Sequence, residues 1–146
     1  MVSYHTTVSW QGEHWGYLRC SNGAEMKFSA PPAVHGHPGV MTPEDGFVGA
    51  VNMCFHMMFI WAAEKFKLNL VSYECDAEGI VSDRLNQTSV FARIVLRPRI
   101  VVAGSSEAQV NKALRSARKY SLIAESVSCE VAVEPVAPNV LPEPNP

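Results

Sequence analysis

The sequence predicts an α+β domain in which helices pack against antiparallel sheets. Three observations carry this prediction: strand-like segments before and after a long apolar helix, an amphipathic helix near residue 110, and turn signals between these elements. The expected order is β-β-β-α-β-β-α-β. With 146 residues, the chain has the length of one domain and can bury a substantial core. We expect a single domain over residues 1–135 and a disordered proline-rich tail over residues 136–146.

The first thirty residues are predicted to form two or three antiparallel strands. The segments "VSYHTTVSW" and "WGYLRC" are rich in β-branched and aromatic residues, and Asn22-Gly23 marks a hairpin before "AEMKFSA". The prolines and glycines of "PPAVHGHPGVM" then predict a long loop. Its His35 and His37 have no partners at metal-ligand spacing, so we expect exposed loop residues and no metal site.

The strongest predicted element is the long helix of "TPEDGFVGAVNMCFHMMFIWAAEKFKL", residues 42–68. Thr42 is a suitable N-cap, Pro43 suits the first helical position, and Asp45 can close a capping box onto Thr42. From residue 47 to residue 61 the helix is apolar nearly all round, which predicts burial on most sides. The apolar run of 47–63 is short of the roughly 20 residues that cross a bilayer and is interrupted by Asn52 and His56, so we expect no membrane span.

The remaining chain is predicted to contain three strands and one helix. Residues 68–81 and 90–103 have strand character, with a polar turn at 83–89 between them, and Pro98 suggests an edge strand or a bulge. Ser106 and Gln109 have the spacing of a capping box at the start of the second helix. The last strand is expected within "SLIAESVSCEVAVEP".

Composition excludes several classes of function. The net charge of −2 and the pI near 6.2 give no basic footprint, so we expect no nucleic-acid partner. The segment "MVSYHTTVSW" lacks the features of a signal peptide, and we expect a cytoplasmic soluble protein. The four cysteines are widely scattered, with no C-x-x-C pair, as expected for free thiols in a reducing compartment: Cys20, Cys54, Cys75 and Cys129.

Among the four thiols, Cys54 has the most unusual context. It lies within the apolar run "GAVNMCFHMMF", where it is either a small core residue or a nucleophile in an apolar pocket. Apolar surroundings raise the pKa of a thiol, and the helix N-terminus lies roughly 18 Å away, so activation would need another cation or donor. The flanking methionines indicate core packing rather than a copper site. The residues alone leave both readings of Cys54 open.

Several segments together resemble the OsmC/Ohr group, which comprises the osmotically induced and organic hydroperoxide resistance proteins. "TPEDGFVGAVNMCF" is similar to the start of that family's central helix, with a Cys-Phe ten residues after the glutamate. "SYECDAEGIV", "FARIVLRPRIVV" and "ALRSARKYSLIAESVSCEVAVEP" resemble the elements that follow it, in the same order. The resemblance implies an OsmC-like intertwined homodimer with sites at the dimer interface and thiol-based reduction of organic hydroperoxides, without a cofactor.

The resemblance also implies roles for individual residues. Cys54 falls on the peroxidatic cysteine and Glu44 on the glutamate that organises the thiol. A pocket of neighbouring apolar side chains would favour alkyl peroxides: Met53, Phe55, Met57 and Met58. The peroxide would oxidise the thiolate to a sulfenic acid, which a second thiol would resolve to a disulfide.

Two positions depart from the family pattern. Ser121 stands where the resolving cysteine is expected, and His14 stands near the position of an arginine that lowers the thiol pKa. Cys129 is a less favoured substitute for the resolving cysteine, and an external thiol reductant is the main expectation.

Three functions therefore remain open. The first is a thiol-dependent peroxidase that uses Cys54 on a small hydrophobic peroxide. The second is a non-catalytic module that binds an apolar ligand at the dimer interface. The third is a hotdog-type thioesterase, which would use a carboxylate such as Glu44 or Asp45 and no thiol.

Overall fold

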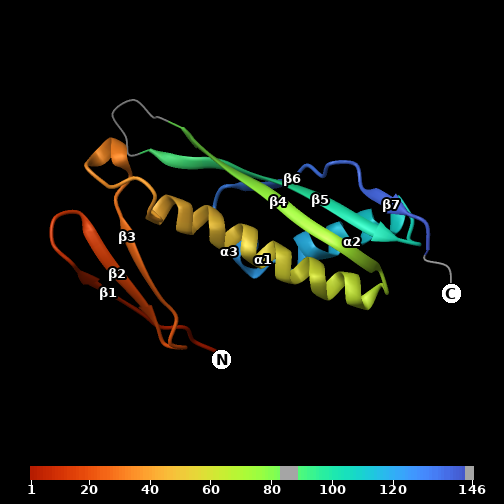
Figure 1. Cartoon of the computed structure of the whole chain (residues 1–146), viewed down its shortest axis with the longest axis horizontal. Helices are drawn as coiled ribbons and strands as arrows, with labels where there is room; N and C mark the ends of the chain where they lie inside the picture. Colours follow the sequence, from red (N-terminus) through yellow and green to blue (C-terminus); the bar gives the residue numbers. More distant parts are fainter. Residues whose placement is uncertain (83–88, 144–146) are drawn as a thin grey trace. The chain divides into compact units, whose positions relative to one another are not determined.

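The computed structural model describes residues 1–82 and 89–143 of the chain, in the order of elements drawn in Figure 1. The predicted polar turn at 83–89 lies outside the described residues except for Ser89, and so do residues 144–146. The chain divides into two compact units, Met1–Phe47 and Val48–Pro146. The single domain over residues 1–135 therefore stays a prediction.

The first unit contains the three predicted antiparallel strands. They are β1 (Thr6–Trp10), β2 (Trp15–Cys20) and β3 (Glu25–Ser29), paired in the order β1-β2-β3. The predicted hairpin forms because Gly23 adopts a positive φ of 96° and the side chain of Asn22 accepts a hydrogen bond from the Ala24 amide. The following loop contains one unpredicted turn of 3-10 helix, η1 (Pro32–Val34).

The long helix α1 (Pro43–Lys65) begins as the sequence predicts. The Thr42 hydroxyl accepts a hydrogen bond from the Asp45 amide at 3.2 Å, and the Asp45 carboxylate accepts one from the Thr42 amide at 3.1 Å. These reciprocal bonds satisfy donors that the first turn of a helix cannot pair internally. The capping box on Thr42 is therefore confirmed, with Asp45 in the place more often taken by glutamate.

The second unit contains a mixed sheet. Its strand β4 (Asn69–Ser82) pairs antiparallel with β5 (Val90–Ala103), whereas β6 (Glu130–Val133) and β7 (Asn139–Leu141) both pair parallel with β5. The expectation of a purely antiparallel sheet was wrong here. The helices α2 (Glu107–Lys119) and α3 (Leu122–Ser126) lie between β5 and β6, and such a helical crossover returns the chain in the same direction. The predicted capping box of Ser106 and Gln109 starts α2.

Pro98 lies in the middle of the central strand β5 and is fully buried, so the prediction of an edge strand or a bulge was wrong. It pairs with Cys75 of β4 on one side. On the other side, β6 pairs only up to Leu96 and β7 only from Val101 onward. The carbonyl of Pro98 accepts a hydrogen bond from Val136 in the gap between them. Because the N–H and C=O of a strand residue point to the same side, the missing N–H faces this gap, where no ladder bond is required.

The tail is partly ordered, in contrast to the predicted disorder from residue 136. Strand β7 pairs with residues 101–103 of β5, and the Leu141 carbonyl accepts a hydrogen bond from the Gly104 amide. The prolines around β7 limit it to three residues, and its place at the margin of the sheet tolerates them.

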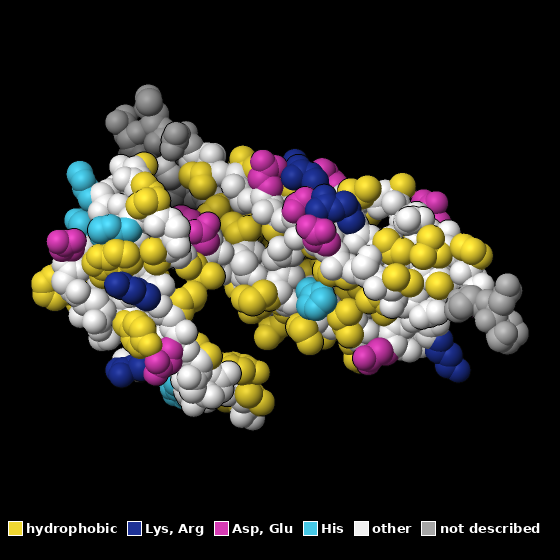
Figure 2. Space-filling model, viewed as in Figure 1, with side chains coloured by type: hydrophobic (Ala, Val, Ile, Leu, Met, Phe, Trp, Pro, Cys, Tyr) yellow, Lys and Arg dark blue, Asp and Glu magenta, His cyan; other side chains and the backbone are white. Residues whose placement is uncertain are grey.

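One face of α1 forms the core of the second unit together with β5 and α2. Its buried residues are Val51, Phe55, Phe59, Ala62 and Ala63. Another face remains exposed, contrary to the predicted burial on most sides: Met53, Met57 and Trp61 are 64%, 59% and 42% exposed. These three residues are here called the α1 stripe. Figure 2 shows hydrophobic side chains gathered over this helix, beside the charged side chains of β4 and β5.

Among the helices of the described ranges, α1 alone has the length and composition to cross a membrane. A single such helix is weak evidence, because the core helix of a soluble protein meets the same criteria.

One face of the sheet in the second unit is covered by ion pairs. Three arginines of β5 alternate with buried residues and pair with carboxylates on both sides. Arg99 lies 2.9 Å from Asp76 and 3.1 Å from Glu74, and Arg97 lies 3.1 Å from Glu78. The remaining pairs of this ladder join Arg93 to Glu130 and Glu134, and Arg97 to Glu134.

Candidate functional site

The predicted nucleophile Cys54 lies on α1 and is half-buried. It follows Met53 of the α1 stripe and precedes Phe55, which is fully buried, so it lies at the border between the exposed and the buried faces. All four cysteines are free thiols. Nothing in the described part of the chain donates a hydrogen bond to the Cys54 sulfur or forms an ion pair with it.

The structure divides the predicted pocket residues between two environments. Met53 and Met57 line a groove of about 410 Å³ between α1 and β4, here called the α1–β4 groove, whose other lining residues are Asn52, His56, Tyr73, Glu74 and Cys75. Phe55 instead belongs to the core, and Met58 is half-buried outside the groove. A helix turns 100° per residue, which places residues 53 and 57 on one stripe and residue 55 away from it. Cys54 itself does not line this groove.

The groove contains a tyrosine and a thiol that sequence reasoning did not assign to a site. The side chain of Asn52 donates a hydrogen bond to the Cys75 carbonyl at 3.2 Å, which fixes α1 against β4. The ring of Tyr73 packs against His56 and Phe59, with centroids 4.8 and 5.2 Å apart. The alternation of residues 73, 75 and 77 does indicate an inward face, but it cannot show which helix covers that face.

Burial governs the chemistry of these two groups. It raises the pKa of Tyr73, with a smaller effect from the neighbouring Cys75, and it raises the pKa of the Cys75 thiol. The Tyr73 hydroxyl is buried, and its polar neighbour in the described part of the chain is the Cys75 thiol, which is a weak hydrogen-bond partner. Both groups are therefore protonated at neutral pH, and Cys75 is not an activated thiol.

Ser121, at the predicted position of the resolving cysteine, is fully buried. Its hydroxyl donates a hydrogen bond of 2.7 Å to the Ala117 carbonyl. The adjacent Tyr120 packs edge-on against Trp61, at a centroid separation of 5.8 Å. Cys129 is half-buried and precedes β6, and it forms no disulfide. Ser121 therefore serves the junction between α2 and α3.

Glu44 and His14 lie in the first unit. Glu44 is exposed in the first turn of α1 and takes no part in the capping box, because Asp45 makes its bonds. His14 lies in the turn between β1 and β2, and its ring stacks on His35 with centroids 5.8 Å apart. Cys54, Ser121 and Cys129 belong to the second unit.

The expectation that His35 and His37 are exposed loop residues without partners was wrong for His37. Its ring stacks on Trp15 at 3.9 Å, its amide donates to the Ser29 hydroxyl, and its Nε2 lies 3.9 Å from the Glu13 carboxylate. Trp15 of β2 thus anchors the loop at His37. Within the described ranges, no group of three or more His, Cys, Asp or Glu residues could hold a metal ion.

Comparisons with known proteins identify one family model and several similar structures. Residues 36–136 match the family model described as OsmC-like protein. No curated protein matches the sequence. An OsmC-like protein of unknown function from Vibrio cholerae has a similar structure, with a TM-score of 0.85 and 25% identity over 93% of this chain and 100% of that one.

Two more distant structures share the fold. An organic hydroperoxide resistance protein from Elizabethkingia anophelis has a TM-score of 0.70 and 14% identity, over 97% of this chain and 96% of its own. The organic hydroperoxide resistance protein OhrB of Bacillus subtilis has a TM-score of 0.65 and 13% identity, over 92% of this chain and 98% of its own.

Proposed function

The chain belongs to the OsmC-like family, and on that premise we propose that it reduces organic hydroperoxides with the thiol of Cys54. Family membership and the names of structural neighbours support a peroxide-related role. The observation that carries the proposal for this chain is the position of Cys54. The thiol is free and half-buried, and it borders the α1 stripe, whose apolar side chains can contact the alkyl group of a peroxide at the edge of an interface.

The proposed reaction is a two-electron reduction. The Cys54 thiolate attacks one peroxide oxygen, the O–O bond breaks, and the alkoxide leaves as an alcohol after it takes up a proton. Cys54 is then a sulfenic acid. An external thiol condenses with it to give a mixed disulfide and water, and a second external thiol releases the Cys54 thiol and an external disulfide. The external thiol supplies the two electrons of each turnover, and it also takes the resolving step because the serine at position 121 cannot form a disulfide.

Glu44 is proposed to organise the reacting thiol, as the resemblance implies. Asp45 makes the capping bonds of α1, which leaves the Glu44 carboxylate exposed and available for this role. His14 carries no comparable support, since its ring stacks on His35.

We further propose that the chain works as a homodimer. The α1 stripe exposes three large apolar side chains in a row, and a contiguous exposed apolar surface of this kind usually marks an interaction site. A second copy is the proposed partner, in keeping with the dimer that the family resemblance implies.

The test is hydroperoxide consumption by the purified protein, with cumene hydroperoxide as substrate and dithiothreitol as reductant. We expect turnover by the unmodified chain, none by Cys54→Ser, and unchanged turnover by Cys75→Ser. Cys75 is the matched control because it is also half-buried in the second unit. Turnover that persists in Cys54→Ser would refute the proposal.

A second candidate function is favoured by the α1–β4 groove. Its wall of Met53, Met57 and Tyr73 suits a small apolar ligand, and it does not include Cys54. A non-catalytic binding module would bind such a ligand while Cys54 reacted with neither peroxide nor a disulfide reagent at neutral pH. The hotdog-type thioesterase would belong to a different family, and the match over residues 36–136 argues against it.

A further inference from the structure

A hollow on the second unit lies between α2 and the segment that contains the end of β6 and the residues after it. It has a volume of about 560 Å³, within the range of small-molecule sites. It is here called the α2 groove. Its lining residues are Asn111, Leu114, Arg115, Arg118, Lys119, Val133 and Pro135, none of which lines the α1–β4 groove.

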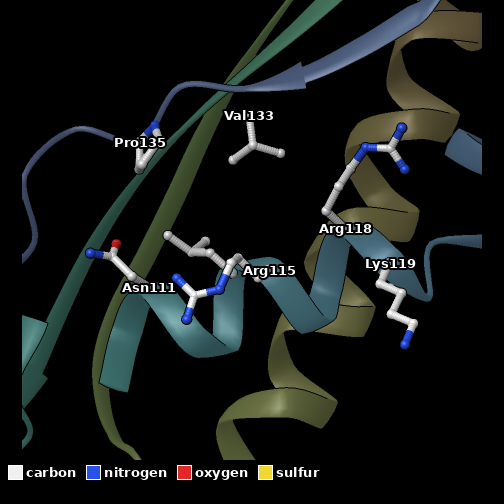
Figure 3. Close-up of a pocket in the computed structure, with 7 residues that line it drawn as sticks. Asn111, Arg115, Arg118, Lys119, Val133 and Pro135 are labelled. Carbon is white, nitrogen blue, oxygen red and sulfur yellow. The ribbon is translucent and has the colours of Figure 1, made fainter. Parts of the chain in front are cut away.

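The α2 groove combines an apolar wall with a cationic margin. Figure 3 shows Val133 and Pro135 on one side of the groove and Asn111, Arg115 and Arg118 on the other, which belongs to α2. Leu114 is almost fully buried at its base. The amphipathic pattern of α2 produces this arrangement, because Leu114 turns toward the core while its neighbour Arg115 turns outward.

The cations of the α2 groove differ in how they are held. Arg118 is fixed: its Nε donates to the Val131 carbonyl at 3.0 Å, and its Nη1 lies 2.8 Å from the Glu125 carboxylate. Arg115 and Lys119 are exposed, and neither forms an ion pair within residues 1–82 and 89–143. Lys119 extends from the end of α2, with its ammonium 5.3 Å from the Tyr120 ring.

Among the described residues, no carboxylate lines the groove beside Arg115 and Lys119, and Glu125 pairs with Arg118. The nearest acidic residues along β6 point elsewhere, because Glu130 and Glu134 pair with arginines of the ladder on the sheet. The chain as a whole has a net charge of −2, so the positive charge of Arg115 and Lys119 beside this hollow does not reflect a generally basic surface. Cations near the end of a helix also complement its dipole, but this explains neither Arg115, which precedes the last turn, nor the apolar wall.

We propose that the α2 groove binds a small amphipathic organic anion, with its apolar chain against Leu114, Val133 and Pro135 and its carboxylate at Arg115 and Lys119. The guanidinium of Arg115 can hold a carboxylate in a bidentate pair, and Lys119 adds a mobile point charge. Arg118 positions the wall, since it ties α2 to β6. The site is independent of the proposed reaction of Cys54.

The test is titration of the full chain with decanoate, followed by ¹H–¹⁵N and methyl NMR. We expect saturable binding with shifts at Leu114 and Val133. We expect 1-decanol, which lacks the anion, and acetate, which lacks the apolar chain, to bind at least about tenfold more weakly, since about 1.4 kcal/mol of binding free energy corresponds to tenfold. Shifts confined to the methionine methyls of the α1–β4 groove would overturn the assignment.

The charge requirement is tested with a double variant, Arg115→Gln with Lys119→Gln. We expect it to weaken decanoate binding about tenfold or more and to leave 1-decanol binding unchanged. The matched control is Lys112→Gln on the same helix, because Lys112 lies over the Phe66 ring and not in the groove. Equal affinity of decanoate for the double variant and the unmodified chain, or equal affinity of decanoate and 1-decanol for the unmodified chain, contradicts the proposal.

Discussion

The hydroxyl of Ser121 donates a hydrogen bond of 2.7 Å to the carbonyl of Ala117, and both residues are fully shielded from solvent. The bond satisfies one of the carbonyls that the end of α2 leaves without a helical partner. The side chain at the position where the resemblance implies a resolving cysteine is thus committed to local structure in this chain.

Ser121→Ala should therefore reduce stability without affecting chemistry. The Ala117 carbonyl would lose its buried partner, and we expect the free energy of unfolding to fall by about 1 kcal/mol. Urea denaturation measures this loss, and the hydroperoxide assay at a temperature where both proteins are folded should give equal rates. A tenfold slower reaction with unchanged stability would show that the hydroxyl acts in the reaction.

The adjacent carboxylates Glu44 and Asp45 should separate stability from activity. Asp45→Ala removes the capping bonds of α1, so we expect a loss of about 1 kcal/mol in the free energy of unfolding. Glu44→Gln should change stability by less than about 0.5 kcal/mol, because the exposed carboxylate makes no capping bond. The same variant should slow hydroperoxide reduction. If Glu44→Gln destabilises the protein as much as Asp45→Ala, the division of roles between the two residues is wrong.

Tyr73→Phe should stabilise the protein at neutral pH. The Tyr73 hydroxyl is buried, and its polar neighbour in the described ranges is the Cys75 thiol, a weak hydrogen-bond partner, so removal of the hydroxyl is expected to gain about 1 kcal/mol. Denaturation at pH 7 measures the change. A loss of stability would indicate a hydrogen bond to a group such as a bound water.

The same variant should weaken the alkaline sensitivity of folding. Since burial raises the pKa of Tyr73 in the folded protein, the unfolded chain gives up this proton first as the pH rises above the ordinary value of 10.0. The free energy of unfolding is therefore unaffected by this ionisation below pH 10.0 and falls above it, by about 1.4 kcal/mol per pH unit for one group. Cys75 acts in the same direction from its ordinary value of 9.0. The free energy of unfolding, measured by urea denaturation at several pH values from 9 to 11, should fall less steeply with pH for Tyr73→Phe than for the unmodified chain.

Cys75 should be the slowest of the four thiols to react with iodoacetamide at pH 7.5. Burial raises its pKa, which lowers the fraction of reactive thiolate. Mass spectrometry of peptides from a timed reaction gives the rate at each cysteine. Faster labelling of Cys75 than of Cys54 would contradict both this prediction and the choice of Cys54 as the nucleophile.

The proposed dimer should depend on the α1 stripe. Met57→Glu places a charge in the exposed apolar row and should shift the protein from dimer to monomer in sedimentation analysis. Leu122→Glu is the control, because Leu122 is 65% exposed on α3 rather than on α1. A monomeric unmodified chain would refute the dimer, and an unaffected dimer of Met57→Glu would place the interface elsewhere.

Local signals predicted much of this fold. The boxes at Thr42 and Ser106 and the turn at Gly23 each depend on residues within three positions of one another, and all three are confirmed. The strands on either side of α1 follow from period-two patterns in the same way. Capping boxes, turns and strand patterns of this kind are determined by neighbouring residues and do not depend on the rest of the fold.

Pairing between distant segments could not be predicted in this way. The tolerance of Pro98 depends on a gap between β6 and β7, and the parallel direction of both strands depends on the crossover through α2 and α3. The groove beside Tyr73 needs α1 to lie on β4, which no pattern within either segment records. Of the four predicted pocket residues, Met53 and Met57 line the α1–β4 groove, whereas Phe55 lies in the core and Met58 lies outside the groove, because an apolar run does not show which of its faces is buried.

The ladder of ion pairs on the sheet has a consequence for assembly. It contains five carboxylates and three guanidinium groups, an excess of two negative charges that equals the formal net charge of the whole chain. The remainder of the chain, including α1, is therefore formally neutral when taken together. The α1 stripe itself contains no charged side chain, so the association of two copies through it should vary little with ionic strength.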